Sequence, residues 1–211
     1  MKKIIAIPAT FALMLSTGLV IGQNTRFSDP ESVIKNEFWG KLYADGGTSF
    51  FCDVPFKSKG FVMTDGYVYP LADIRSALDC GTNSQCKHDN RYRQIVSDMH
   101  NMVVVPTRLE MRRRTARYEN LGETINTDDC GIRESNQFFE PPEHVKGDVA
   151  RTMAYMVDTY GLPWLGATPV FQGWSRMDPP DDKELTRHRM VAEIQGNENP
   201  FVTNPDLINR L

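Results

Sequence analysis

The N-terminal segment constrains this chain most, because it decides the compartment in which the rest folds. Residues 1–3 are Met-Lys-Lys, and residues 4–22 run almost without charge. This is the pattern of a cleaved export signal. An uncleaved membrane anchor is the alternative, since the apolar run approaches the roughly 20 residues that span a bilayer. We expect a signal peptide over residues 1–22, no membrane attachment after cleavage, and a periplasmic or secreted protein.

The cysteines fit that location. They are Cys52, Cys80, Cys86 and Cys130. An oxidising compartment favours disulfides, and four cysteines allow three pairings. Cys80 and Cys86 enclose only Gly-Thr-Asn-Ser-Gln, which favours a bond between them and leaves Cys52 with Cys130. A zinc site is the less favoured reading, because no C-x-x-C pair or matching histidine spacing is present.

Length and charge limit the organisation and the partners of the mature chain. Residues 23–211 are enough for one domain and short for two. No internal repeat or low-complexity linker suggests a second domain. The whole chain has a net charge of -3, and loss of the two leader lysines makes it -5. This excludes a globally basic nucleic-acid binder, so binding to a polyanion would require a local patch.

Hydrophobic spacing predicts a mixed α+β fold that is mostly helical. Apolar residues recur at helical spacing in four segments: 28–44, 89–101, 143–160 and 183–195. The segment 143–160 has the pattern of an amphipathic helix. Aromatic and β-branched residues separated by turn residues predict two short strands within 48–70, and residues 103–105 predict another.

A basic run is the densest charge cluster in the chain. It contains Arg108, Arg112, Arg113, Arg114 and Arg117. Such runs are usually solvated faces, and the functional alternative is a phosphate-contacting strip, because arginine donates paired hydrogen bonds to phosphate.

The chain contains none of the common phosphate-loop, zinc-protease, serine-hydrolase or calcium-loop motifs. These patterns alone predict an exported domain with a basic strip.

Several sequence blocks carry a further signal, and they occur in a fixed order. They read F-W-G-K-L-Y at 38–43, F-C-D-V-P-F at 51–56, D-M-H-N-M at 98–102, F-F-E-P-P-x4-G-x2-A-R-T-x2-Y-M at 138–156, and I-Q-G-N-E-N-P-F at 194–201. Together these blocks resemble the bacterial endonuclease I family of periplasmic and secreted nucleases. The resemblance implies an endonuclease I-like fold with a ββα-metal-type core.

The resemblance also implies a chemistry that this chain has altered. In the family, the histidine of W-E-H-V-V-P deprotonates water, while its glutamate and the asparagine of a later R-x-N hold magnesium. Placing residues 68–70 on V-V-P puts Gly66 at the glutamate and Tyr67 at the histidine. Arg113 falls on the arginine and Thr115 on the asparagine. An ordinary phenol, with a pKa of about 10, is a poor general base at neutral pH.

Two nearby residues are candidates to replace the lost groups. Asp65 would supply a substitute metal ligand if the strand shifted by one residue. His100 belongs to the D-x-H-N block, which family members carry beside their catalytic histidine, so we interpret it as structural.

We therefore expect a pseudo-enzyme of the endonuclease I family that binds DNA, another nucleic acid or a protein partner without hydrolysing phosphodiesters. No cofactor is expected for this function. The first alternative is an active, divergent, magnesium-dependent DNA endonuclease of low sequence preference. The second is a structural or interaction protein of the cell envelope.

Overall fold

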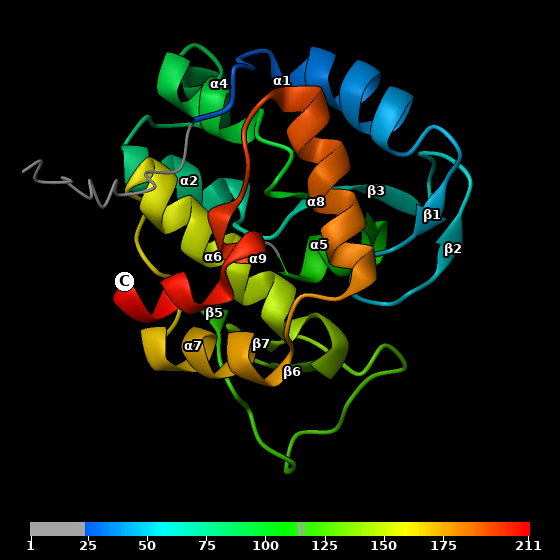
Figure 1. Ribbon diagram of the computed structural model, residues 1–211, viewed down its shortest axis with the longest axis vertical. Helices are drawn as coiled ribbons and strands as arrows, with labels where there is room; N and C mark the ends of the chain where they lie inside the picture. The colour runs from blue at the N-terminus through cyan, green and yellow to red at the C-terminus, as the bar shows by residue number, and fades with distance from the viewer. Residues whose placement is uncertain (1–23, 114, 116) are drawn as a thin grey trace, which may run out of the picture.

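The computed structural model describes residues 24–113, 115 and 117–211. The expected signal peptide and Arg114 lie outside the described residues. The described chain has the predicted mixed α+β architecture (Figure 1). Its helical elements are α1 (Pro30–Ser32), η1 (Val33–Leu42), α2 (Leu71–Leu78), α3 (Asn83–Cys86), α4 (Asn90–Val96), α5 (Thr107–Arg113), η2 (Glu143–Val145), α6 (Lys146–Tyr160), α7 (Thr168–Met177), α8 (Asp182–Gln195), α9 (Pro200–Thr203) and η3 (Pro205–Arg210).

The strands are short and form three separate sheets. They are β1 (Gly47–Thr48), β2 (Pro55–Phe56), β3 (Met63–Tyr67), β4 (Met102–Pro106), β5 (Arg117–Tyr118), β6 (Arg133–Ser135) and β7 (Phe138–Glu140). β1 pairs with β2 and β3 pairs with β4, both antiparallel. In the third sheet β7 lies between β5, to which it is parallel, and β6, to which it is antiparallel. The segment predicted to hold two strands thus contains three.

The first predicted helix forms as α1 followed by the π-helix η1. Asp29 caps its beginning by accepting a hydrogen bond from the Ser32 backbone N–H at 3.4 Å, and Pro30 occupies the first turn. Such a start suits a helix because the first backbone N–H groups have no partners within it. One side of η1 is buried, with Phe38 fully enclosed. The opposite side remains open to solvent.

The β3–β4 ribbon lies between two hydrophobic cores. Successive strand residues point to opposite faces, and the register pairs Gly66 with Val103 and Tyr67 with Met102. The larger core, which also contains much of α6, includes Val103, Val105 and Leu109. The smaller core, which lies against η1, includes Phe38, Tyr67, Met102 and Val104. The buried apolar side chains of the ribbon therefore divide between the two cores.

The helix α5 completes a ββα unit with this ribbon. It begins directly after β4, and the Thr107 backbone N–H donates to the Val62 carbonyl at 2.9 Å, just before β3. Leu109 anchors α5 in the larger core. This arrangement agrees with the fold expected from the resemblance.

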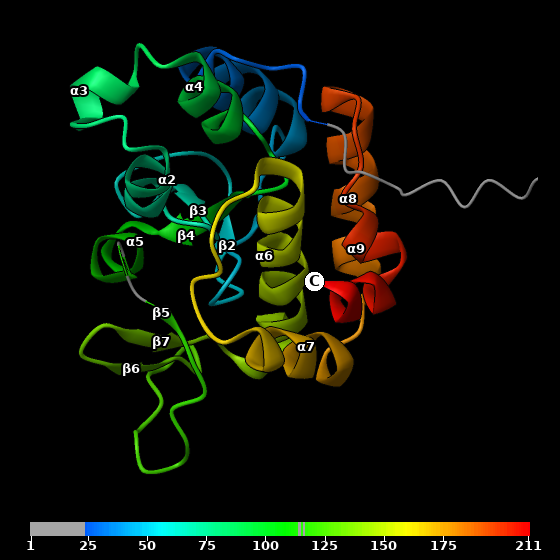
Figure 2. The same cartoon turned by 90° about the vertical axis from the view of Figure 1, so that its left-hand side faces the viewer.

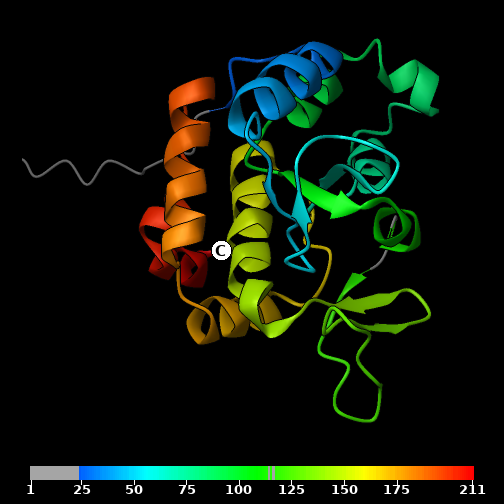
Figure 3. The same cartoon turned by 90° about the vertical axis from the view of Figure 1, so that its right-hand side faces the viewer.

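The helix α6 runs through the middle of the fold. It has α8 and α9 on one side and the ribbon with α5 on the other (Figures 2 and 3). The buried surface of α6 is wider than the one apolar stripe of an amphipathic helix, because even Arg151 is fully buried and mainly the last turns reach solvent. Gly147 permits a close crossing, since a Cβ atom there would lie 1.8 Å from the Asp178 carbonyl oxygen. Gly161 ends the helix at a φ of 64°, which favours glycine.

Both disulfides form in the pairing that loop length favoured. Cys80 bonds to Cys86, and Cys52 bonds to Cys130 across a sequence separation of 78. The longer bond ties the segment after β1 to the β5–β6 loop, which projects away from the rest of the fold (Figures 1 and 3). Within the described residues, every helix is too short or too polar to cross a bilayer.

Candidate functional site

Gly66 lies on the face of the ribbon that looks toward α5. A Cβ atom at this position would lie 2.6 Å from Val105 Cγ2 and 2.7 Å from Glu110 Oε2. Real Cβ atoms do not approach other atoms so closely, so the space that a side chain at position 66 would enter is already filled. The group that fills it is the carboxylate of Glu110, which comes from α5 and not from the ribbon.

Tyr67 and Asp65 lie on the opposite face of the ribbon. Tyr67 is only 4% exposed and directs its hydroxyl to the Val96 carbonyl at 3.4 Å. Burial, reinforced by the negative charge of Asp65, raises the pKa of this phenol further above its ordinary value. Asp65 accepts hydrogen bonds from Trp39 Nε1 at 3.2 Å and from Lys59. The strand alternation therefore directs Asp65 away from α5, and the one-residue shift that would have made it a substitute ligand does not occur.

Arg113 organises the α5 face from inside the protein. Its guanidinium, 2% exposed, donates to Glu110 Oε2 at 2.8 Å, to the Val68 carbonyl at 3.3 Å, to Tyr118 Oη at 3.1 Å and to the Tyr67 carbonyl. Burial opposes its charge, yet Tyr118 and Glu110 together raise its pKa above the usual value for arginine. Arg113 is thus a cross-link between α5 and the end of β3, and not a surface group.

The donor set around Gly66 does not suit magnesium. Mg²⁺ requires oxygen ligands in near-octahedral geometry, usually including carboxylates. Gly66 offers no side chain, and the carboxylate of Glu110 already pairs with the Arg113 cation. Thr115 is exposed just beyond the end of α5. No cluster of three or more acidic, histidine or cysteine side chains suited to a metal occurs in the part of the chain that the structure describes.

The basic strip is largely neutralised within the protein. Arg112 pairs with Asp128 at 3.1 Å and with Glu134 at 3.5 Å. Arg117 lies 3.7 Å from Asp73. With Arg113 buried and Arg114 outside the described residues, Arg108 is the strip's one exposed arginine that has no ion pair among the described residues. Much of the charge of the predicted strip is therefore used in contacts within the fold, and its role in binding phosphate stays a prediction.

Three of the sequence blocks that carried the resemblance, at 98–102, 138–156 and 194–201, meet in a buried polar centre. Asp98 accepts hydrogen bonds from the hydroxyls of Tyr155 and Tyr160, both at 2.6 Å, and from Gln195 Nε2 at 2.7 Å. His100 bonds through Nε2 to the Asn197 carbonyl at 3.0 Å. Burial lowers the pKa of His100 to about 4. These contacts join the α4–β4 turn to α6 and to the end of α8, which fits the interpretation of His100 as structural.

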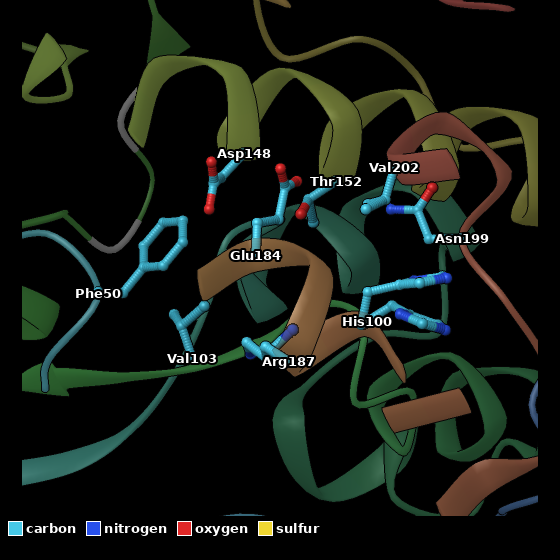
Figure 4. Close-up of a pocket in the computed structure, with 10 residues that line it drawn as sticks. Phe50, His100, Val103, Asp148, Thr152, Glu184, Arg187, Asn199 and Val202 are labelled. Atoms are coloured by element: carbon cyan, nitrogen blue, oxygen red, sulfur yellow. The ribbon is translucent and has the colours of Figure 1, made fainter. Parts of the chain in front are cut away.

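A small cavity adjoins this centre between α6 and α8 (Figure 4). Its volume of about 30 Å³ accommodates one water molecule and excludes a nucleotide. Asp148 from α6 and Glu184 from α8 lie close together there (Figure 4). Arg151 pairs with both, 3.2 Å from Asp148 Oδ1 and 2.6 Å from Glu184 Oε2. Burial, and then the charge of Glu184, raises the pKa of Asp148 well above its ordinary value. The cavity is an interior ionic centre and not a substrate site.

Comparison with known proteins decides the family. The Endonuclease I family model matches residues 79–206, which is more than half of the chain. The chain belongs to the endonuclease I family. The match covers the polar centre, α5 and Thr115, but it begins after Gly66 and Tyr67. The family match of this endonuclease I chain thus lies outside the β3 strand that carries both residues.

Curated relatives span most of the chain. The extracellular deoxyribonuclease of Aeromonas hydrophila is 27% identical over 192 residues, covering 77% of this chain and 84% of the relative. The periplasmic deoxyribonuclease of the same organism is 26% identical over 222 residues, covering 90% and 93%. An extracellular ribonuclease of Bacillus amyloliquefaciens is 33% identical over 87 residues, covering 32% and 30%. The similarity thus extends to relatives named for either nucleic acid.

Sequence reasoning missed one residue beside Gly66. Glu110 lies three positions before Arg113, a spacing at which an acidic and a basic side chain meet on a helix. That spacing was the available signal. Sequence spacing could not show that the same carboxylate would also fill the space beside Gly66, because this depends on how α5 docks on the ribbon.

Proposed function

We propose that this protein is a non-hydrolytic member of the endonuclease I family that binds nucleic acid. The observation that carries the proposal is the pair of ribbon positions 66 and 67. The first has no side chain and faces Glu110, while the second is a buried tyrosine on the other face. Neither residue supplies the metal ligand or the base that the family resemblance places there.

The protonation state of Tyr67 supports the loss of hydrolysis. A general base must accept a proton from water at the working pH. Tyr67 is enclosed by the smaller core, and its raised pKa keeps the phenol protonated at neutral pH. The nearby histidine does not replace it, because His100 is buried in the polar centre and bonded to Asn197.

The location and organisation of the protein form part of this proposal. The protein is secreted or periplasmic, which its two disulfides and the names of its extracellular and periplasmic relatives support. We infer a signal peptide over residues 1–22 and a mature chain of residues 23–211 that forms one endonuclease I-like domain. The names of its deoxyribonuclease and ribonuclease relatives support nucleic acid as the proposed ligand.

The decisive experiment is plasmid nicking by the purified, oxidised mature chain, with magnesium and with chelator. We expect no nicking in either condition. A restored variant would carry Gly66→Glu, Tyr67→His and Thr115→Asn together with Glu110→Ala, because an added glutamate needs the space of the existing carboxylate. Magnesium-dependent nicking that appears only in this variant would strongly support a silenced nuclease scaffold.

An active divergent nuclease is the second candidate, and one observation favours it. The Glu110 carboxylate lies in the space beside position 66. If the unaltered protein nicks plasmid with magnesium, the non-hydrolytic proposal is wrong. In that case Glu110→Gln should abolish the activity, whereas Glu134→Gln, which alters an exposed carboxylate on β6, should leave it unchanged.

A further inference from the structure

A groove on the open side of η1 combines an aromatic wall with cationic side chains. Its volume is about 500 Å³, within the range of small-molecule sites. It is lined by Glu31, Ile34, Lys35, Trp39 and Lys59. Four of these residues come from α1 and η1, and Lys59 comes from the loop before β3. The groove therefore lies where the N-terminal helix meets the ribbon, away from the Gly66 face.

Trp39 is held in place before any ligand arrives. Its indole N–H donates to Asp65 Oδ1 at 3.2 Å, and its ring makes edge contacts with Phe38 at 5.5 Å and Phe56 at 5.8 Å between centroids. The residue is nevertheless partly exposed. A positioned aromatic ring binds a base with little loss of side-chain freedom.

The charge at the groove favours an anion. Lys35 is exposed and has no carboxylate within ion-pair distance among the described residues. The single acidic lining residue, Glu31, lies 3.5 Å from Lys87 and is partly neutralised by it. Because Lys59 pairs with Asp65, the positive charge available at the groove comes from Lys35.

The loop that contributes Lys59 also exposes an aromatic side chain. This loop, residues 57–62, reads Lys-Ser-Lys-Gly-Phe-Val and contains no carboxylate. Phe61 is fully exposed, and the neighbouring Val62 is 71% exposed. An aromatic ring left in water beside lysines resembles the stacking platforms of single-strand binding proteins.

We propose that this groove and the 57–62 loop bind single-stranded nucleic acid, with bases stacking on Trp39 and Phe61 and phosphates meeting Lys35 and Lys57. The inference rests on the proposed function and deepens it by naming the strand form and the binding surface. Bases in a duplex are stacked inside it, so exposed aromatic rings favour unpaired nucleotides. The partly neutralised arginine strip near α5 would then be a minor contributor.

The test measures binding of the protein to a labelled ten-nucleotide oligothymidylate and to a labelled hairpin duplex by fluorescence anisotropy. Chelator is present so that no cleavage interferes. We expect the single strand to bind more tightly. Phe61→Ala should weaken this binding about tenfold or more, because one base stack is worth roughly 1–3 kcal/mol. Lys35→Gln should reduce the slope of log K against log salt by about 0.7.

Intrinsic tryptophan fluorescence tests independently whether the oligonucleotide contacts Trp39. Oligothymidylate should quench the tryptophan emission, and Trp39→Phe should remove that quenching. Met177→Ala on α7 and Arg210→Gln on η3 are matched controls, because both alter exposed residues on elements away from η1: α7 lies at the opposite end of the fold (Figure 1), and η3 packs against α7 and α9. All variants should retain the circular dichroism spectrum of the unaltered protein, since the altered side chains are at least partly exposed.

Each outcome bears on the inference. Binding that is equal for duplex and single strand, or unchanged by both Phe61→Ala and Lys35→Gln, would overturn it while leaving nucleic-acid binding intact. Absence of any binding by the unaltered protein would refute the nucleic-acid part of the proposed function as well. If both substitutions leave single-strand binding and the quenching of Trp39 unchanged, Phe61 and Lys35 do not contact the strand. The surface proposed here, which includes both residues, would then be wrong.

Discussion

The carboxylate of Glu110 and the missing side chain of Gly66 occupy one space. A Cβ atom at Gly66 would lie 2.7 Å from Glu110 Oε2, and the same oxygen accepts a hydrogen bond from Arg113 at 2.8 Å. The glycine therefore lets α5 dock closely on the ribbon, with a buried ion pair at the contact. Restoring a family-like side chain at position 66 requires a change on α5.

This contact predicts a coupled effect on stability. Gly66→Ala should lower the free energy of unfolding by about 1–3 kcal/mol, the usual cost of overpacking, and by less in a Glu110→Ala background. Denaturant unfolding of the two single variants and the double variant measures the coupling. Gly60→Ala is the control, since a Cβ there meets no atom within 4 Å. Additive effects of the two substitutions would show that the close contact has no energetic consequence.

Neighbouring arginines on α5 should respond very differently to the same substitution. Arg113→Lys should cost about 2–4 kcal/mol, because lysine lacks the fork that serves Glu110, Tyr118 and two carbonyls in a buried site. Arg112→Lys should stay within about 0.5 kcal/mol, because Arg112 is exposed and surface ion pairs contribute little. Chemical denaturation would compare the two, and equal losses would contradict the buried role of Arg113.

His100 should make the protein less stable in mild acid. Its pKa falls from 6.5 to about 4 in the folded state, mainly through burial. A depressed histidine pKa contributes stability above pH 6.5 that is lost as the pH falls toward 4, by about 3 kcal/mol in total. Thermal unfolding between pH 7 and pH 4 should therefore show a shallower pH dependence in His100→Gln than in the unaltered protein. The exposed His88→Gln control should follow the unaltered curve; if it and His100→Gln behave alike, His100 is not the titrating group.

The two carboxyl groups beside Arg151 should have opposite effects at neutral pH. Burial and the charge of Glu184 raise the pKa of Asp148 above the value it has in the unfolded chain. The free energy of unfolding therefore falls as the pH rises above that unfolded-state pKa and Asp148 must ionise. Asp148→Asn should thus leave the unfolding free energy at pH 7 unchanged or higher. Burial raises the pKa of Glu184 as well, but its carboxylate makes a two-point contact with buried Arg151, so Glu184→Gln should lower the unfolding free energy by about 3–5 kcal/mol. A large loss in Asp148→Asn would show that its charged form stabilises the fold.

Much of the fold could be predicted because its signals are local. The Asp29–Pro30 start, the helical spacing of 143–160 and the valines of β4 each act over a few residues, and the structure contains the corresponding elements. The cysteine pairing also followed from a short loop. The family followed from blocks whose side chains the structure brings together around Asp98.

The candidate sites were harder to predict because they depend on direction and docking. A run of arginines looks uniform in sequence, but the rotation of α5 buries Arg113 and leaves Arg108 and Arg112 outside. Asp65 and Gly66 are adjacent in sequence, yet strand alternation places them on opposite faces of the ribbon. The groove at Trp39 joins η1 to a loop some 20 residues later, a proximity that no local pattern encodes.

The sequence alone determined that positions 66 and 67 carry a glycine and a tyrosine, and a glycine side chain cannot bind a metal while a phenol is a poor base at neutral pH wherever they lie. It also determined the helices within 28–44, 89–101, 143–160 and 183–195, the ribbon strands and the family, but not α2 and α7. Only the tertiary structure decided which charges are free, because a charge is available to a partner only if the fold leaves it solvated and unpaired. Because docking of α5 buries Arg113, we expect the cationic binding surface at the η1 groove and not along the arginine run.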